Sequence, residues 1–193
     1  FFKDNPTRIG LNDVELGVNY VIILNTNAGL WGYNIGDTVK FVSLNPYRLI
    51  VTGRIKQFIS AQGEHVIVEE TEDALLKSAN ELNADIVEFT VAPSFKTDKE
   101  NAYHEWFVEF AKPPQNLGLL EEKVDLAMQK KNIYYRDLRK GNMLLRLKIR
   151  EIKKNGFRDC MKSKGKLGGQ NKVPRLANDR VFADELKTYI SND

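Results

Sequence analysis

Residues 71–110, TEDALLKSANELNADIVEFTVAPSFKTDKENAYHEWFVEF, contain the pattern that decides the fold class. Within residues 71–82, four apolar side chains recur at helical spacing and share one face: Leu75, Leu76, Ala79 and Leu82. The periodicity then changes, and residues 86–92 and 103–110 have the apolar composition of two strands. This segment therefore predicts a helix followed by two strands, which is typical of a mixed α and β architecture.

The flanking sequence extends this architecture in both directions. Short strands are expected at 58–61 and 66–68 on the N-terminal side. On the C-terminal side, periodicity predicts a helix over 117–131, a strand over 144–152, a short helix over 157–162 and a closing helix over 179–189. From about residue 56 onward we expect a compact α+β unit, in which a short sheet is covered by helices.

The N-terminal part of the chain has a different texture. Residues 20–25, 37–43 and 48–52 read as short antiparallel strands separated by Asn, Gly and Pro. The chain opens with Phe1 and no initiator Met, and these strands lack further strands to pair with. We therefore expect a fragment, in which residues 1–55 are the C-terminal edge of a larger domain and residues 56–193 are a separate small domain.

Composition excludes several classes of protein. The 193 residues are 42% hydrophobic and 28% charged, an ordinary globular balance, and the formal net charge of +3 is too small to indicate nucleic-acid binding. The longest apolar run, Tyr20 to Leu24, is far shorter than the roughly 20 residues of a membrane helix. The single Cys160 excludes an internal disulfide, and no spacing indicates a metal site. A cytoplasmic protein that binds neither membranes nor nucleic acid is expected.

Two positions near the end of the N-terminal strands are candidate ligand contacts. In Tyr33-Asn34-Ile35-Gly36-Asp37, the glycine permits a tight turn, and the carboxylate of Asp37 can accept two hydrogen bonds from a vicinal diol. Arg54 follows after one hairpin and could return to the same edge as a planar donor. Taken alone, Gly-Asp between strands is usually a simple turn, and an arginine such as Arg54 at a domain edge is usually a surface residue.

A basic, glycine-rich segment near the C-terminus is a candidate anion site. Four cations occur in this segment without any acid: Lys164, Lys166, Lys172 and Arg175. Three glycines let the backbone approach a ligand closely, and Pro174 stiffens the chain just after Lys172. The segment is not a Walker loop, because the Gly-Lys-Ser/Thr order is absent. A basic loop that contacts any polyanion remains an alternative.

These motifs occur in an order that resembles the adenylate-forming superfamily of acyl-CoA synthetases, luciferases and peptide-synthetase adenylation domains. Within it, the chain is most similar to the auxin-responsive acyl acid-amido synthetases, particularly their bacterial members. Four stretches carry the resemblance: residues 25–31 (NTNAGLW), 33–37 (YNIGD), 104–106 (HEW) and 165–175 (GKLGGQNKVPR). It covers essentially the whole chain, and the last stretch is the most specific.

The resemblance implies a two-step ligase. ATP activates a carboxylic acid as an acyl-adenylate with loss of pyrophosphate, and an amine, usually of an amino acid, then displaces AMP to form an amide. The implied cofactors are ATP and Mg²⁺, and the implied partner within the protein is a large N-terminal domain. The small C-terminal domain would be a mobile lid that swings between the two half-reactions.

The resemblance also implies residue roles. Tyr33, Asp37 and Arg54 would contact the nucleotide, with Asp37 on the ribose hydroxyls. Lys56 falls at the hinge position of the superfamily. No metal ligand is implied among these residues.

In the small domain, Lys172 matches the lysine that reaches the α-phosphate and acyl oxygen during adenylation, so it is the expected catalytic residue. His65, in Gly63-Glu64-His65, stands where the family often has lysine near the phosphate, and it is the remaining expected nucleotide contact. His104 and Trp106 are expected to be structural.

Two other functions remain open. A non-catalytic module could use the basic segment to bind a polyanion or a protein, and a degenerate ligase could bind nucleotide without forming an adenylate. The fragment alone is expected to be inactive, because most of the acid and nucleotide pocket would lie in the missing domain.

Overall fold

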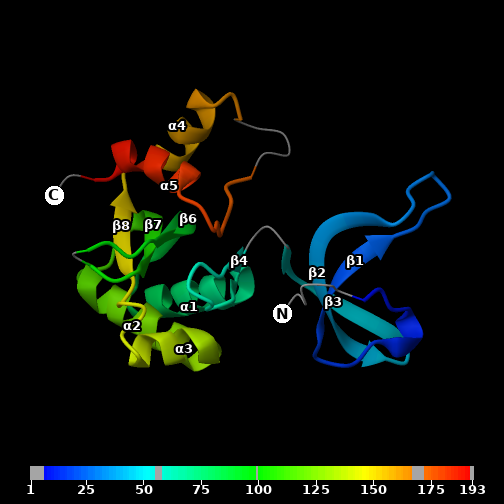
Figure 1. Cartoon of the computed structure of the whole chain (residues 1–193). Helices are drawn as coiled ribbons and strands as arrows, with labels where there is room; N and C mark the ends of the chain where they lie inside the picture. The colour runs from blue at the N-terminus through cyan, green and yellow to red at the C-terminus, as the bar shows by residue number, and fades with distance from the viewer. Residues whose placement is uncertain (1–6, 55–57, 99, 167–171, 192–193) are drawn as a thin grey trace. The chain divides into compact units, whose positions relative to one another are not determined.

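The computed structural model of the chain describes residues 7–54, 58–98, 100–166 and 172–191 (Figure 1). The chain divides into two compact units, Phe1–Gln57 and Phe58–Asp193. The first is a small antiparallel sheet, and the second combines sheets with helices, so the predicted α+β class is confirmed. In the described part of the chain, no helix has the length and apolar character needed to cross a membrane.

The first unit is a three-stranded antiparallel sheet in the order β1-β2-β3. Its elements are a short 3-10 turn η1 (Leu11–Asp13), β1 (Asn19–Leu24), β2 (Tyr33–Leu44) and β3 (Tyr47–Arg54). β2 starts earlier than predicted because Tyr33 and Asn34 pair with the end of β1, across an irregularity in the register. The Tyr33–Asp37 motif is therefore part of a strand rather than a turn between strands.

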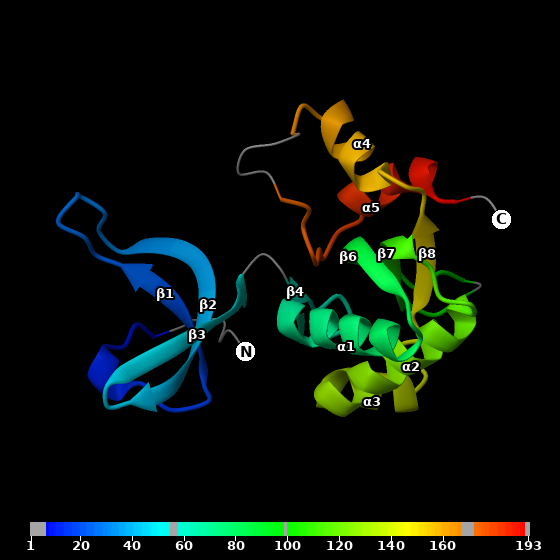
Figure 2. The same cartoon turned by 180° about the vertical axis from the view of Figure 1, so that it is seen from behind.

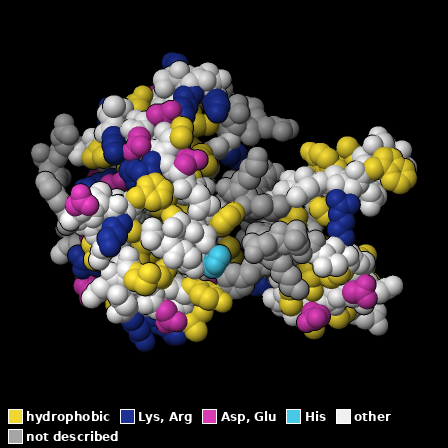
Figure 3. Space-filling model, viewed as in Figure 1, with side chains coloured by type: hydrophobic (Ala, Val, Ile, Leu, Met, Phe, Trp, Pro, Cys, Tyr) yellow, Lys and Arg dark blue, Asp and Glu magenta, His cyan; other side chains and the backbone are white. Residues whose placement is uncertain are grey.

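The core of this first unit is small. Val39 and Phe41 of β2 are its only buried apolar residues among those described, and the rings of Tyr20 and Tyr47 each meet Phe41 edge-on at 6.1 Å between centroids. Many other apolar side chains are exposed, including Trp31 at 82% and Val51 at 66% (Figure 3). Among the described residues of this unit, more large apolar side chains are exposed than are buried.

The second unit is built on the three-stranded sheet β6-β7-β8, with β6 antiparallel and β8 parallel to β7. Its elements are β4 (Phe58–Ile59), β5 (Val66–Ile67), α1 (Val68–Glu81), β6 (Asp85–Ser94), β7 (Tyr103–Lys112), α2 (Leu117–Lys131), α3 (Ile133–Lys140), β8 (Lys148–Ile152), α4 (Gly156–Ser163), α5 (Val181–Leu186) and the turn η2 (Lys187–Tyr189). Helices α1 to α3 lie on one side of the sheet, and α4 and α5 lie on the other (Figures 1 and 2).

The central strand β7 is buried on both faces. Trp106 belongs to the apolar cluster shared with α1 and α2, where it joins Leu75 and Leu120. Phe107, the next residue, belongs to a second cluster that contains Phe157 of α4. Successive side chains of a strand point to opposite faces, so the two neighbours anchor opposite helical layers. Trp106 is a core residue, as predicted.

Some element boundaries differ from the predictions. α2 has the predicted bounds. α3 was not predicted, because the single residue Asn132 both ends α2 and caps the start of α3. Its Oδ1 accepts a hydrogen bond from the backbone N–H of Tyr135 at 2.8 Å. β8 is shorter than the predicted strand over 144–152, and α1 begins three residues before the predicted start at Thr71.

Candidate functional site

The structure places Asp37 and Arg54 opposite each other on neighbouring strands. They are Cα partners in the register of β2 and β3, although seventeen residues separate them in the sequence. Positions that face each other in an antiparallel pair have Cβ atoms about 4.5–5.5 Å apart. Asp37 is half-buried and Tyr33, at the start of the same strand, is 50% exposed. The register therefore brings Asp37 and Arg54 together, while Tyr33 lies four residues earlier on β2 and pairs with Leu24 of β1.

Gly36 shapes the backbone just before Asp37. Its φ of 85° lies in the left-handed region that side-chain-bearing residues avoid, while a Cβ built there would meet no atom within 4 Å. The side chain of Asn34 accepts a hydrogen bond from the N–H of Gly36 at 2.8 Å. Backbone conformation rather than space therefore favours glycine at this position, which lies within β2 and not in the predicted tight turn.

The predicted hinge residue, Lys56, lies outside the described residues. The division between the two compact units falls one residue later in the sequence, after Gln57.

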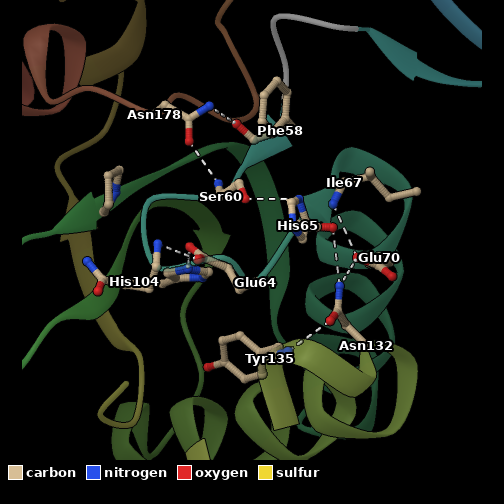
Figure 4. Close-up of polar contacts among 12 residues, drawn as sticks. Phe58, Ser60, Glu64, His65, Ile67, Glu70, His104, Asn132, Tyr135 and Asn178 are labelled. Atoms are coloured by element: carbon tan, nitrogen blue, oxygen red, sulfur yellow. Dashed lines mark hydrogen bonds and ion pairs between the residues drawn. The ribbon is translucent and has the colours of Figure 1, made fainter. Parts of the chain in front are cut away.

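In the second unit, the β4–β5 hairpin displays His65. This residue has a φ of 48° and is exposed, and its Nδ1 lies 2.9 Å from the hydroxyl oxygen of Ser60 (Figure 4). The ring of Tyr134 meets the imidazole edge-on, with 5.8 Å between centroids. Two neighbours thus restrict the orientation of the His65 ring.

A buried ion pair lies beneath this hairpin. Glu64 and His104 are both buried, with 2.8 Å between Oε1 and Nε2, and Glu64 Oε2 also accepts the N–H of Gln62 (Figure 4). Burial alone would raise the pKa of the Glu64 carboxyl, but its hydrogen bond to His104 and the attraction between them bring that pKa below its ordinary value. His104 is structural, as predicted, and it fixes the residue that precedes His65.

Asn178 ties the chain after the basic segment to the same hairpin. Its Oδ1 accepts the N–H of Ser60 at 2.8 Å, and its Nδ2 donates to the carbonyl of Phe58 at 2.9 Å (Figure 4). Sequence reasoning missed Ser60 and Asn178, since no local pattern links residues that are 118 positions apart.

The basic segment carries less free charge than its sequence suggested. Lys164 forms an ion pair with Glu185 of α5, and Arg175 forms one with Glu88 of β6. Residues 167–171 lie outside the described part of the chain. Lys172 is exposed, and no acidic side chain within the described ranges forms an ion pair with it. Two of the four cations of the predicted anion site therefore have acidic partners within the folded unit.

No group of three or more His, Cys, Asp or Glu side chains is placed to hold a metal ion in the residues that the structure covers.

The sequence matches two profiles of one family. The profile described as "GH3 family C-terminal domain" matches residues 69–181, which is more than half of the chain. The profile described as "GH3 family central domain" matches residues 2–54. The boundary between the two matches agrees with the boundary between the two compact units.

Two plant proteins are among the similar relatives. The "Probable indole-3-acetic acid-amido synthetase GH3.2" of Oryza sativa subsp. japonica is 26% identical over 208 residues, covering 96% of this chain and 33% of the relative. The "Indole-3-acetic acid-amido synthetase GH3.10" of Arabidopsis thaliana is 26% identical over 199 residues, covering 96% and 32%. The chain therefore spans about a third of the length of these relatives.

Solved structures share the fold. The "GH3.15 acyl acid amido synthetase" superposes with a TM-score of 0.76 at 20% identity, covering 95% of this chain and 36% of that one. The "AtGH3.15 acyl acid amido synthetase in complex with 2,4-DB" gives 0.74 at 20% identity, covering 95% and 35%. The predicted architecture is confirmed at the level of the fold.

Proposed function

The chain belongs to the GH3 family, and from this membership we propose that it is the C-terminal part of an ATP-dependent acyl acid-amido synthetase. In the proposed reaction, a carboxylate oxygen attacks the α-phosphate of ATP and pyrophosphate leaves. The amine of an amino acid then attacks the acyl carbon of the acyl-adenylate, forming an amide and releasing AMP. The names of the plant relatives and the family assignment support this reaction class.

One observation in the coordinates supports the nucleotide role most directly, the pairing of Asp37 with Arg54 across β2 and β3. A carboxylate accepts hydrogen bonds from both hydroxyls of a ribose, and a guanidinium donates to phosphate or ribose oxygens. We assign both residues to the nucleotide, with Tyr33 beside them. Gly36 gives the strand the conformation that presents Asp37.

We assign the second unit the role of a mobile lid. Residues 56–193 would move relative to the large domain, of which residues 1–55 would form the C-terminal edge, with Lys56 as the hinge. Lys172 would offset the negative charge that develops when the carboxylate and the α-phosphate come together. His65 would approach the phosphates in place of the lysine that is common in the family.

The remainder of the full-length protein is the proposed partner of the first unit. The exposed apolar residues of its sheet include Leu49, Ile50 and Val51 of β3, which alternate between the two faces of the strand. In the proposal, the remainder of the protein covers these apolar side chains. The acid and amine pockets would lie mainly in that remainder.

Acid-dependent exchange of pyrophosphate into ATP by the full-length protein tests the proposal. A panel of carboxylic acids should start from indole-3-acetate and 2,4-DB, the compounds in the names of the relatives and of the solved structure. We expect exchange with at least one acid and amide formation only when an amino acid is added. Nucleotide binding without exchange would identify a degenerate ligase. Salt-sensitive polyanion binding that ATP and AMP do not affect would instead identify a binding module.

A further inference from the structure

The chain that follows Lys172 is docked on the open edge of the β6-β7-β8 sheet. The N–H of Val91 donates to the carbonyl of Arg175 at 2.9 Å, and the N–H of Ala177 donates to the carbonyl of Val91 at 3.2 Å. Leu176, which is buried, forms a parallel bridge with Val91. This stretch is drawn as a coil between α4 and α5 (Figures 1 and 2), and its backbone bonds join it to β6. Its backbone is thus fixed from Arg175 onward.

Thr90 holds the chain at a point closer to Lys172, at Pro174. Its side chain is buried, and its hydroxyl donates a hydrogen bond of 2.6 Å to the carbonyl of Pro174, two residues after Lys172. Proline restricts φ to about −65°, so holding its carbonyl also restricts the direction in which the preceding residues leave the sheet. Thr90 and Pro174 are 84 residues apart in the sequence. The contact therefore exists only in the folded unit.

Arg175 holds the same stretch from its other side. Its Nη1 donates to the carbonyl of Phe89 at 3.1 Å, its guanidinium lies 4.6 Å from the centre of the Phe89 ring, and it pairs with Glu88. The side chain of Arg175, which the sequence suggested as an anion-binding cation, is thus bound to Glu88 and Phe89 of β6. Its neighbour Pro174 is bound to the next residue of the strand, Thr90.

We propose that Thr90 is a positioning residue for Lys172 in adenylate formation. The inference rests on the proposed function, and it adds the residue that holds the backbone next to Lys172. About four rotatable carbon–carbon bonds separate the ammonium of a lysine from its backbone, so it reaches one phosphate reproducibly only if that backbone is fixed. The Thr90 hydroxyl, the Arg175 pair and the bridge to Val91 provide that fixation on the C-terminal side of Lys172.

The test replaces Thr90 with valine, which keeps the shape and removes the hydroxyl, and with serine, which keeps the hydroxyl. Both are made in the full-length protein. Because a displacement of about 1 Å can cost up to 100-fold in rate, we expect Thr90→Val to lower kcat for pyrophosphate exchange by roughly 10- to 100-fold with little change in the KM for ATP. Thr90→Ser should retain most of the activity. Amide formation from a pre-made acyl-adenylate should change little in either variant.

A double-mutant cycle with Lys172→Ala separates positioning from stability. If Thr90 acts through the lysine, Thr90→Val should have almost no further effect on exchange once Lys172 is alanine. An additive loss, or an equal loss in both half-reactions, would show that Thr90 only stabilises the fold. Should Thr90→Val fail to fold, Glu88→Gln weakens the Arg175 contact at a half-exposed site, and it is expected to act in the same direction and in the same cycle.

The outcomes also distinguish the catalytic role of Lys172 from the positioning role of Thr90. If Lys172→Ala leaves exchange unchanged, the proposed role of the lysine fails. If Lys172→Ala lowers exchange while both Thr90→Val and Glu88→Gln leave it intact, the lysine role stands and the positioning inference alone is wrong.

Discussion

At the scale of single residues, Lys172 differs from Lys164 and Arg175 by its surroundings. Lys164 and Arg175 are held by acidic partners from α5 and β6, whereas Lys172 is exposed next to a fixed stretch of backbone. An ammonium placed in this way can be presented to a ligand without first breaking an ion pair.

Substitution of Lys172 should affect one half-reaction. Lys172→Ala in the full-length protein is expected to lower the rate of adenylation by a factor on the order of 10²–10³, as observed when one preorganised transition-state donor is lost. Amide formation from a pre-made adenylate should be affected far less. Lys166→Ala, in the same segment, is the matched control, and single-turnover measurements separate the steps. Equal effects of the two substitutions would indicate only a basic patch.

Asp37 is the residue whose removal should affect binding rather than chemistry. Asp37→Ala in the full-length protein should weaken ATP binding by roughly 1.5–3 kcal/mol, because a charged acceptor of hydrogen bonds is lost. Asp37→Asn keeps one acceptor oxygen and should lose less. Isothermal titration with ATP measures both. Unchanged affinity in Asp37→Ala would mean that Gly36-Asp37 only shapes the β2 strand.

At the scale of elements, Glu105 of β7 connects three segments of the second unit. Its two carboxylate oxygens bind Arg150 of β8 at 2.8 Å and Arg180, just before α5, at 2.6 Å. Arg180 also donates to the carbonyl of Pro93 at the end of β6. The buried carboxylate thus fixes how the sheet meets α5, and through it the chain that returns from the basic segment.

The protonation of Glu105 should make the stability of this unit depend on pH. Burial raises its pKa, but the hydrogen bonds from Arg150 and Arg180 outweigh burial, so the pKa is below the ordinary value of 4.5. A lowered folded-state pKa means that the unfolded chain binds the proton first. The stabilisation is therefore fully present above pH 4.5 and is lost as the pH falls through the folded-state pKa.

Urea denaturation between about pH 7 and pH 3 measures this effect. Glu105→Gln should be less stable than the parent at neutral pH by roughly 1.5–3 kcal/mol. Its stability should also fall less on acidification. Glu122→Gln, an exposed position on α2, is the control and should reproduce the parent curve. A Glu105→Gln curve parallel to the parent would exclude Glu105 as a source of the acid sensitivity.

At the scale of the whole molecule, the two units differ in how much apolar surface they bury. The second has an apolar cluster on each face of its sheet, and the first has only Val39 and Phe41 as buried apolar residues among those described. A three-stranded sheet with so small a core is marginal in water. The second unit has the internal packing of an independent domain, which a lid that moves as a rigid body requires.

Separate expression of residues 58–193 tests this difference. We expect that fragment to unfold in one cooperative transition by circular dichroism and calorimetry, whereas residues 1–57 alone should show none. The 193-residue chain should give no pyrophosphate exchange, because proximity of the acid, the nucleotide and the catalytic groups supplies a large part of such a rate. Measurable exchange by this chain alone would contradict the assignment of the second unit as a lid over a missing pocket.

The sequence by itself determined the features that depend on local pattern. Helical spacing of apolar residues gave α2 its bounds, alternation and composition gave β6 and β7, and the order of short motifs identified the family. Gly36 has the left-handed backbone that glycine tolerates best, although it lies within β2 and not in the predicted tight turn. The signals for α2, β6 and β7 are local, whereas the family was identified from the order of motifs along the whole chain.

Tertiary structure alone decided which polar groups meet. Glu64 pairs with His104 across 40 residues, Thr90 holds Pro174 across 84, and Arg175 is neutralised by an acid of another element. A charge or a hydroxyl has no periodicity in the sequence, and its partner depends on how the sheet and helices pack. The sequence could therefore name Lys172, while only the folded unit shows that its neighbours are bound to β6 and that Lys172 itself is exposed.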